Sequence, residues 1–158
     1  MQTSKARCSA FDKAVNLLAF KDRTVQEIRQ RLNEKGYSSE DIEDTVEKLS
    51  YYGYLNDQNY TISYIKDNTS KKGKKLIINE LNQKGVEKTV INEVYESMDV
   101  DEIDTIKKLV ERRFQALDFN DDKSYRRVVG YLLRRGFSYE NIKKVIRCRN
   151  SVLEDEVL

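Results

Sequence analysis

The chain contains no histidine and no proline, and only six of its 158 residues are glycine. Without histidine it has neither the usual general base nor the commonest metal ligand, and the Ser-His-Asp arrangement is excluded. Without proline it has few helix breakers, while lysine, glutamate, arginine and leucine, all good helix formers, are frequent. These absences predict a chain that is helical nearly throughout.

Long apolar segments are also missing. No run approaches the ~18 residues that a membrane span needs, and residues 1–13 contain no apolar signal core. Cys8 and Cys148 stand alone without metal-type spacing, so we expect two isolated thiols rather than a disulfide. With 35% charged and 39% hydrophobic residues, the composition suits a soluble helical protein. We expect a cytoplasmic protein that does not contact membranes.

A twelve-residue pattern occurs three times, as RLNEKGYSSEDI at 31–42, ELNQKGVEKTVI at 80–91 and YLLRRGFSYENI at 131–142. Alignment on the glycine of each copy places the copies 49 and 51 residues apart. Apolar residues then coincide four and eight positions before the glycine and six and ten after it, a spacing that puts each set on one helical face. In chain order the glycines and these positions are Gly36, Gly85 and Gly136; Leu32, Leu81 and Leu132; Ile28, Ile77 and Val128; Ile42, Ile91 and Ile142; Val46, Tyr95 and Ile146.

Each glycine is predicted to end a helix in the left-handed conformation. Helix starts are predicted at a capping box formed by Thr24 and Glu27, and at serine caps. The predicted serine caps are Ser38 or Ser39, Ser138, and Ser124. One such copy would only be an ordinary helical hairpin, but three copies in register at a near-constant period indicate an architecture.

Because another amphipathic stretch precedes each copy, the sequence predicts three tandem three-helix units. The period of ~50 residues matches none of the common helical-repeat lengths. We assign the first unit to residues 9–55, the second to residues 56–101 and the third, which is basic, to residues 102–149. Residues 150–158 form an acidic tail that we expect to fray.

Positive charge is concentrated in the third unit. The net charge of the chain is +2, yet residues 101–150 contain thirteen Lys or Arg against eight Asp or Glu. Between Ile106 and Arg149 the same thirteen cations face five acids, whereas the first fifty residues hold nine of each sign. The third unit is therefore the candidate for contact with a phosphate backbone or an acidic protein, and a solvated charged face is the alternative.

Helical projection turns most cations of this unit away from its apolar face. We expect them to lack the carboxylates at i±4 that would neutralise them. Gly130 lies on the same outward side, where it costs about 1 kcal/mol relative to alanine, and close approach of a partner is the only account of it that the sequence offers. The candidate contact residues are Lys107, Lys108, Arg112, Arg126, Arg127, Tyr131, Arg134, Lys143, Lys144 and Arg147, with Lys71, Lys72, Lys74 and Lys75 of the KKGKK run as secondary candidates.

Two tyrosines of the third unit have two interpretations. Tyr131 and Tyr139 would be anchors for a partner if they are exposed beside arginines, because Tyr and Arg are enriched among interface hot spots. Packing between adjacent units is the alternative. A nucleic-acid partner would be bound with a steep salt dependence and without readout of its sequence.

Four motifs in this order resemble the RecX family of bacterial recombination regulators, over roughly residues 13–149. Two positions depart from the family pattern: Asn56 replaces the first acid of the linker, and Asp67-Asn68-Thr69 stands where members commonly carry an arginine. The motifs are Arg23-Thr24 with Glu27-Ile28, Leu32 and Lys35-Gly36-Tyr37; Gly53-Tyr54-Leu55-Asn56-Asp57 with Tyr60 and Tyr64; Glu80-Leu81 with Lys84-Gly85-Val86; and Leu132-Leu133-Arg134-Arg135-Gly136-Phe137.

The resemblance implies an all-α fold in which three tandem three-helix repeats form an elongated, curved array. It also implies a regulator that binds RecA, both the monomer and its filament on single-stranded DNA, by lodging in the groove of the filament. Such a regulator inhibits filament extension, ATP hydrolysis, strand exchange and cleavage of the repressor of the damage response. Direct contact with single-stranded DNA is a further implication.

Two other functions remain open at this point: a nucleic-acid-binding module that acts independently of RecA, and a helical scaffold for another protein. We expect no enzyme and no cofactor, because the chain has no phosphate-binding glycine loop or metal-ligand cluster and its acids sit singly on helix exteriors. We also expect a monomer. The resemblance transfers no set of essential residues, so the candidate contact residues rest on helical projection.

Overall fold

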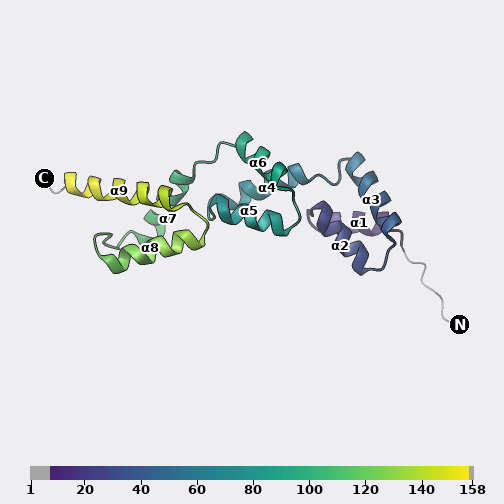
Figure 1. Ribbon diagram of the computed structural model, residues 1–158, viewed down its shortest axis with the longest axis horizontal. Helices are drawn as coiled ribbons and strands as arrows, with labels where there is room; N and C mark the ends of the chain where they lie inside the picture. Colours follow the sequence, from purple (N-terminus) through teal and green to yellow (C-terminus); the bar gives the residue numbers. More distant parts are fainter. Residues whose placement is uncertain (1–7, 157–158) are drawn as a thin grey trace. The chain divides into compact units, whose positions relative to one another are not determined.

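The computed structural model describes residues 8–156, with side chains described for residues 8–150. Within that range all regular secondary structure is α-helical, as the sequence predicts (Figure 1). The helices are α1 (Ala10–Phe20), α2 (Val25–Glu34), α3 (Ser39–Tyr51), α4 (Asp57–Asn68), α5 (Lys74–Gln83), α6 (Lys88–Ser97), α7 (Glu102–Phe114), α8 (Asp122–Arg134) and α9 (Tyr139–Glu156).

The repeated apolar positions form the buried core, which confirms the predicted register. The leucines four residues before the three glycines are fully buried, and so are the residues eight before them. The first repeat packs α1, α2 and α3 around one apolar cluster, and the third repeat packs α7, α8 and α9 around another. Burial of several such side chains, at about 1.5–3 kcal/mol each, stabilises each bundle.

The three glycines close the hairpins as predicted. Gly36, Gly85 and Gly136 have φ angles of 81°, 86° and 88°, a region that favours glycine because it has no Cβ. After each one, the next amide donates to the carbonyl of the buried leucine: Tyr37 to Leu32 at 3.2 Å, Val86 to Leu81 at 3.1 Å and Phe137 to Leu132 at 3.2 Å. This pairing satisfies carbonyls that a helix end would otherwise leave free.

Three of the predicted helix starts are confirmed and one is wrong. Thr24 and Glu27 form the capping box, and the hydroxyls of Ser38 and Ser138 accept from amides three residues ahead. Ser124, by contrast, lies inside α8, whose cap is Asp121. The Asp121 carboxylate accepts from both the amide and the hydroxyl of Ser124, and these bonds lower the pKa of Asp121. A charged acceptor one turn earlier therefore outcompetes the serine.

By internal packing the chain divides into two compact units. Within the described range, one unit contains residues 8–63 together with 81–94, and the other contains 64–80 together with 95–156. The middle repeat, α4 to α6, therefore contributes residues to both units. In the first unit α1, α2 and α3 pack on one another, and in the second α7, α8 and α9 do the same.

The end of the described chain differs from the expectation of a frayed tail. Helix α9 continues to Glu156, so residues 150–156 of the acidic segment are helical, and residues 157–158 lie outside the described range. Cys8 and Cys148 are exposed and are not joined in a disulfide. Among residues 8–156, no helix has the length and apolar character to cross a membrane.

Candidate partner-binding surface

The cations of the third repeat point outward from its core, as helical projection predicts. Val128, Val129 and Leu132 of α8 are buried, and so are the equivalent apolar positions of α7 and α9. The candidate residues on the opposite faces are exposed, except for Lys143 and Tyr131, which are half-buried. The exposed set consists of Lys107, Lys108 and Arg112 on α7, Arg126, Arg127 and Arg134 on α8, and Lys144 and Arg147 on α9.

Two of these cations are neutralised, contrary to expectation. Lys108 pairs with Asp104 at 2.8 Å and Lys144 pairs with Glu140 at 3.2 Å, both at i, i+4 within one helix. The hydrogen bond to Asp104 raises the pKa of Lys108, so this lysine stays charged. The expectation that the outward cations lack such carboxylates is therefore wrong at these two positions, and also at Lys107 and Arg126, although their i±4 acids, Glu111 and Asp122, form no ion pair with them. Exposed pairs of this kind contribute little to stability, but they reduce the charge offered to a partner.

The remaining exposed cations have no ion pair with any carboxylate among residues 8–150. Among the candidate residues they are Lys107, Arg112, Arg126, Arg127, Arg134 and Arg147. Three of the six belong to α8, which makes this helix the most strongly basic of the three. Because these side chains stand on helices of a packed bundle, their backbone positions are fixed before any partner arrives.

Tyr131 is held inside the repeat and is not a free anchor. Its ring packs edge-on against Phe114 at 5.3 Å between centroids, with the guanidinium of Arg113 at 4.6 Å and that of Arg135 at 5.2 Å. Such cation–π contacts contribute about 0.5–1 kcal/mol each at exposed sites. The sequence offered exposure or packing between units for this tyrosine, and the structure shows packing between α7 and α8 of one repeat.

Tyr139 is the more accessible of the two tyrosines, with 49% of its surface exposed. Its hydroxyl lies 3.3 Å from that of Tyr125, which links α9 to α8 and raises the pKa of Tyr125. The ammonium of Lys143 lies 5.9 Å from the centre of the Tyr139 ring. An exposed ring beside a cation is thus present at the α8–α9 seam.

Gly130 has a local explanation that the sequence did not provide. Arg127, Gly130 and Arg134 follow one another on one face of α8, and a Cβ built on Gly130 would lie 3.2 Å from Nη1 of Arg134. The guanidinium of Arg134 therefore folds back over the space that a side chain would take. The contact is to the far end of a flexible side chain, so it can move at small cost.

Replacing Gly130 by alanine is expected to stabilise the protein. Alanine is favoured over glycine inside a helix by about 1 kcal/mol, and only the guanidinium of Arg134 has to shift. For a chain of this length the midpoint of thermal unfolding should rise by about 2–4 °C. Circular dichroism during heating measures it, and a lower midpoint would show that the glycine is needed by the fold itself.

The secondary candidates of the KKGKK run belong mostly to a joint between the second and third repeats. The amide of Gly73 donates to the carbonyl of Arg135 at 2.7 Å, and the amide of Lys75 donates to the carbonyl of Gly136 at 3.3 Å. A Cβ on Gly73 would lie 2.3 Å from the carbonyl of Gly136, so only glycine allows this approach. The start of α5 is thereby docked on the glycine turn that follows α8.

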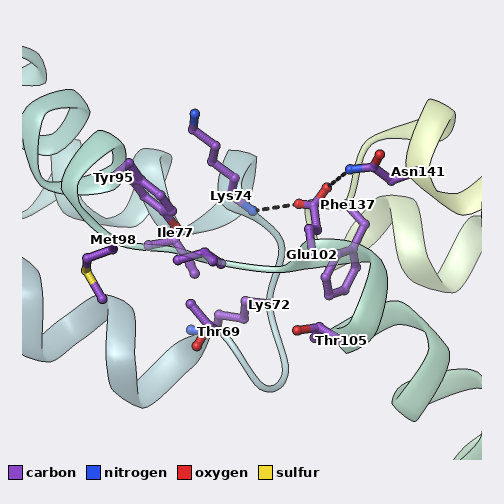
Figure 2. Close-up of a pocket in the computed structure, with 11 residues that line it drawn as sticks. Thr69, Lys72, Lys74, Ile77, Tyr95, Met98, Glu102, Thr105, Phe137 and Asn141 are labelled. Carbon is purple, nitrogen blue, oxygen red and sulfur yellow. Dashed lines mark hydrogen bonds between the residues drawn. The ribbon is translucent and has the colours of Figure 1, made fainter.

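Glu102 completes this joint from the first residue of α7. Its carboxylate accepts from the amide of Lys74 at 3.1 Å and from the side-chain amide of Asn141 at 2.6 Å (Figure 2). A carboxylate at a helix start is favoured by the dipole of α5. The pocket beside it, about 260 Å³, is also lined by Tyr95, whose pKa is raised by burial and by the charge of Glu102.

The lysine side chains of the run differ in accessibility. The ammonium of Lys72 bonds both oxygens of Glu80 at 2.8 Å, and Tyr64 donates to the same carboxylate. That of Lys74 lies 5.2 Å from the ring centre of Tyr95. Lys71, Lys74 and Lys75 are exposed and form no ion pair among the residues whose side chains are described. As an outward surface, the secondary candidates are thus reduced to these three, because Lys72 is paired with Glu80.

A matching joint connects the first repeat to the second. The hydroxyl of Thr24 donates to the carbonyl of Lys84 at 2.6 Å, and the amide of Val25 donates to Asp57, the first residue of α4, at 2.9 Å. Burial raises the pKa of Asp57, although the bond from Val25 opposes that shift. A Cβ on Gly85 would lie 2.3 Å from the Cβ of Gln26. The glycine turn of one repeat therefore receives the second helix of the repeat before it.

Comparison with known proteins identifies the architecture. Models of the first, second and third three-helix domains of RecX match residues 10–49, 56–94 and 99–146. The regulatory protein RecX of Vibrio vulnificus is 33% identical over 136 residues, which cover 85% of this chain and 89% of that protein. That of Trichlorobacter lovleyi is 34% identical over 139 residues, with 84% and 90% covered.

The solved structures agree on the fold. The crystal structure of RecX from Lactobacillus salivarius superposes with a TM-score of 0.76 at 24% identity, over 87% of this chain and 92% of that one. The three domain models match consecutive segments of the chain, and these segments coincide with the three repeats seen in the structure. This chain belongs to the RecX family of regulatory proteins.

Proposed function

We propose that this protein binds both the RecA monomer and the RecA filament on single-stranded DNA. In this proposal it inhibits filament extension, ATP hydrolysis, strand exchange and coprotease activity. Membership of the RecX family supports a regulatory role. The observation that carries the choice of surface is the outward face of α8, where Arg126, Arg127 and Arg134 are exposed without ion pairs to the described carboxylates.

The contact surface in this proposal consists of the unpaired cations of the third repeat, with Tyr139 at the α8–α9 seam. Charged groups held on rigid helices steer association and fix the register of a complex. They would meet acidic side chains of RecA or phosphates of the bound strand. Lys108 and Lys144, which are already paired, and Tyr131, which is packed, contribute less.

The test is the DNA-dependent ATPase activity of RecA with increasing amounts of this protein. We expect suppression at amounts well below one molecule per RecA protomer, because one bound molecule that blocks filament extension affects many protomers. Unchanged hydrolysis at a stoichiometric excess would refute the proposal. Filament length in electron micrographs gives an independent measure of the same effect.

A nucleic-acid-binding module that acts without RecA is the second candidate. The same unpaired cations favour it, since six of them could neutralise phosphates and release counterions. It predicts tight binding to single-stranded DNA with a steep salt dependence in the absence of RecA, strong enough to account for the whole inhibition. Weak DNA binding alongside potent inhibition would exclude it.

A further inference from the structure

A second surface with different chemistry lies at the end of the first repeat. Tyr51, Tyr52 and Tyr54, which follow one another through the turn after α3, are 85%, 62% and 68% exposed. Phe20, at the end of α1, is 83% exposed. The core of the first repeat forms without any of these four side chains. We call the three tyrosines the tyrosine edge.

The rings of the tyrosine edge contact one another rather than the core. Tyr51 and Tyr52 meet edge-on with centroids 5.4 Å apart, and Tyr52 and Tyr54 are tilted at 6.4 Å. Tyr54 also lines a shallow hollow of about 160 Å³ with Leu18, Asp22 and Arg23. An aromatic group of this exposure beside a hollow is typical of a protein-binding site.

The glycine in the turn between these tyrosines has open space around it. Gly53 has a φ of 77°, and a Cβ on it would meet nothing within 4 Å. The amide of Tyr54 donates to the carbonyl of Leu49 at 2.9 Å, which closes α3 in the same way as the other glycine turns. The backbone is thus fixed while the rings face solvent, so their exposure is a property of a rigid turn.

The charge next to the tyrosine edge selects the kind of partner. Helix α3 carries five carboxylates and one lysine. Asp44, Glu47 and Tyr51 share one exposed face at i, i+3 and i+7, and neither acid is in an ion pair with a described cation. Glu43, by contrast, is paired with Arg29 at 2.9 Å. Such a face repels the phosphates of a nucleic acid and attracts a basic protein surface.

We propose that the tyrosine edge, with Asp44 and Glu47, binds an apolar recess rimmed by basic side chains on a protein. This inference rests on the proposed function, in which that protein is a RecA protomer and not the DNA strand of the filament. The two ends of the chain then have separate roles. The first repeat recognises protein through aromatic and acidic groups, and the third repeat supplies cations.

The test compares variants for binding to purified RecA without DNA and, separately, to single-stranded DNA without RecA. We expect the triple variant Tyr51→Ser, Tyr52→Ser, Tyr54→Ser to bind RecA more weakly by a factor on the order of 30 or more, since truncated hot spots cost about 2 kcal/mol or more. Its binding to single-stranded DNA should be unchanged. The matched triple replacement by phenylalanine keeps the rings and should retain most of the affinity for RecA.

A second variant tests the charge argument without touching the aromatic rings. Asp44→Lys with Glu47→Lys should weaken binding to RecA, whereas stronger or unchanged binding overturns the inference. A triple serine variant that loses DNA binding but keeps RecA binding also overturns it. If the triple variant unfolds, Tyr51→Ser alone, at the most exposed ring, replaces it. If the wild-type protein itself does not bind RecA, the proposed function is refuted as well. If the wild type binds RecA and the variants bind equally well, only this inference fails, so the two failures can be told apart.

Discussion

Gly136→Ala is expected to lower the free energy of unfolding by about 3 kcal/mol or more. The left-handed φ of 88° costs a residue with a Cβ about 1–2 kcal/mol. The added Cβ would also lie 2.4 Å from the Cβ of Leu76 and 2.5 Å from its backbone nitrogen. Because backbone cannot yield as a side-chain tip does, the start of α5 must move away, and the hydrogen bonds from Gly73 and Lys75, about 1 kcal/mol each, are weakened.

Gly53→Ala is the matched control for this effect. Gly53 has a similar φ of 77°, but a Cβ there meets nothing within 4 Å. Its cost should therefore be the backbone strain alone, about 1–2 kcal/mol. Urea unfolding of both variants, followed by far-ultraviolet circular dichroism, gives the difference. Equal losses would mean that the joint between the second and third repeats contributes nothing to stability.

Reversing two charges on α8 is expected to have the largest effect on function. Arg127→Glu with Arg134→Glu replaces two exposed cations that form no ion pair with described carboxylates, so the fold should be retained. Facing an acidic surface or phosphates, each new carboxylate adds repulsion in addition to the lost attraction. The concentration that halves the ATPase activity of RecA should rise roughly 100-fold, equivalent to about 2.7 kcal/mol.

Lys66→Glu with Lys88→Glu makes the same change in net charge elsewhere. Both lysines are exposed, lie in the middle repeat and have no ion pair among the described side chains. This control should leave inhibition within about threefold of the wild type if the surface of α8 is specific. Comparable loss in both variants would show that net charge, and not this face, governs inhibition. Titration in increasing salt should show a shallower dependence for the α8 variant.

Much of the fold could be predicted because it depends on local spacing. The leucines at 32, 81 and 132 repeat at the same distance from a glycine, and each is fully buried. The outward direction of Arg127 and Arg134 followed from helical projection, since a helix in a bundle has only one buried face. The pairs Asp104–Lys108 and Glu140–Lys144 were also present in the sequence at i, i+4, but the same spacing gives Lys107–Glu111 and Asp122–Arg126, which form no ion pair, so spacing alone does not tell which pairs form.

Other parts of the surface depend on tertiary contacts that no local pattern encodes. Arg135 lies one turn from Tyr131, but Arg113 reaches the same ring from another helix. Thr24 and Lys84 are sixty residues apart, and their hydrogen bond exists only once α2 meets the next glycine turn. The tyrosine edge was visible as YYGY, yet its exposure depends on what the neighbouring helices leave uncovered.

The two joints have a consequence for how such a chain could be lengthened. The backbone amides of Val25 and Lys74, at the starts of α2 and α5, each donate to a carboxylate of the following repeat. The equivalent amide of α8, that of Tyr125, instead donates to the carbonyl of Asp121 at the start of its own helix, at 2.9 Å. Among residues 8–156, only the middle repeat has both a glycine turn that receives the helix start of the preceding repeat and a helix start that donates to the following repeat. Tandem duplication of residues 56–101 should therefore extend the protein by one repeat, while a copy of the third repeat placed after α9 would find no joint to fill.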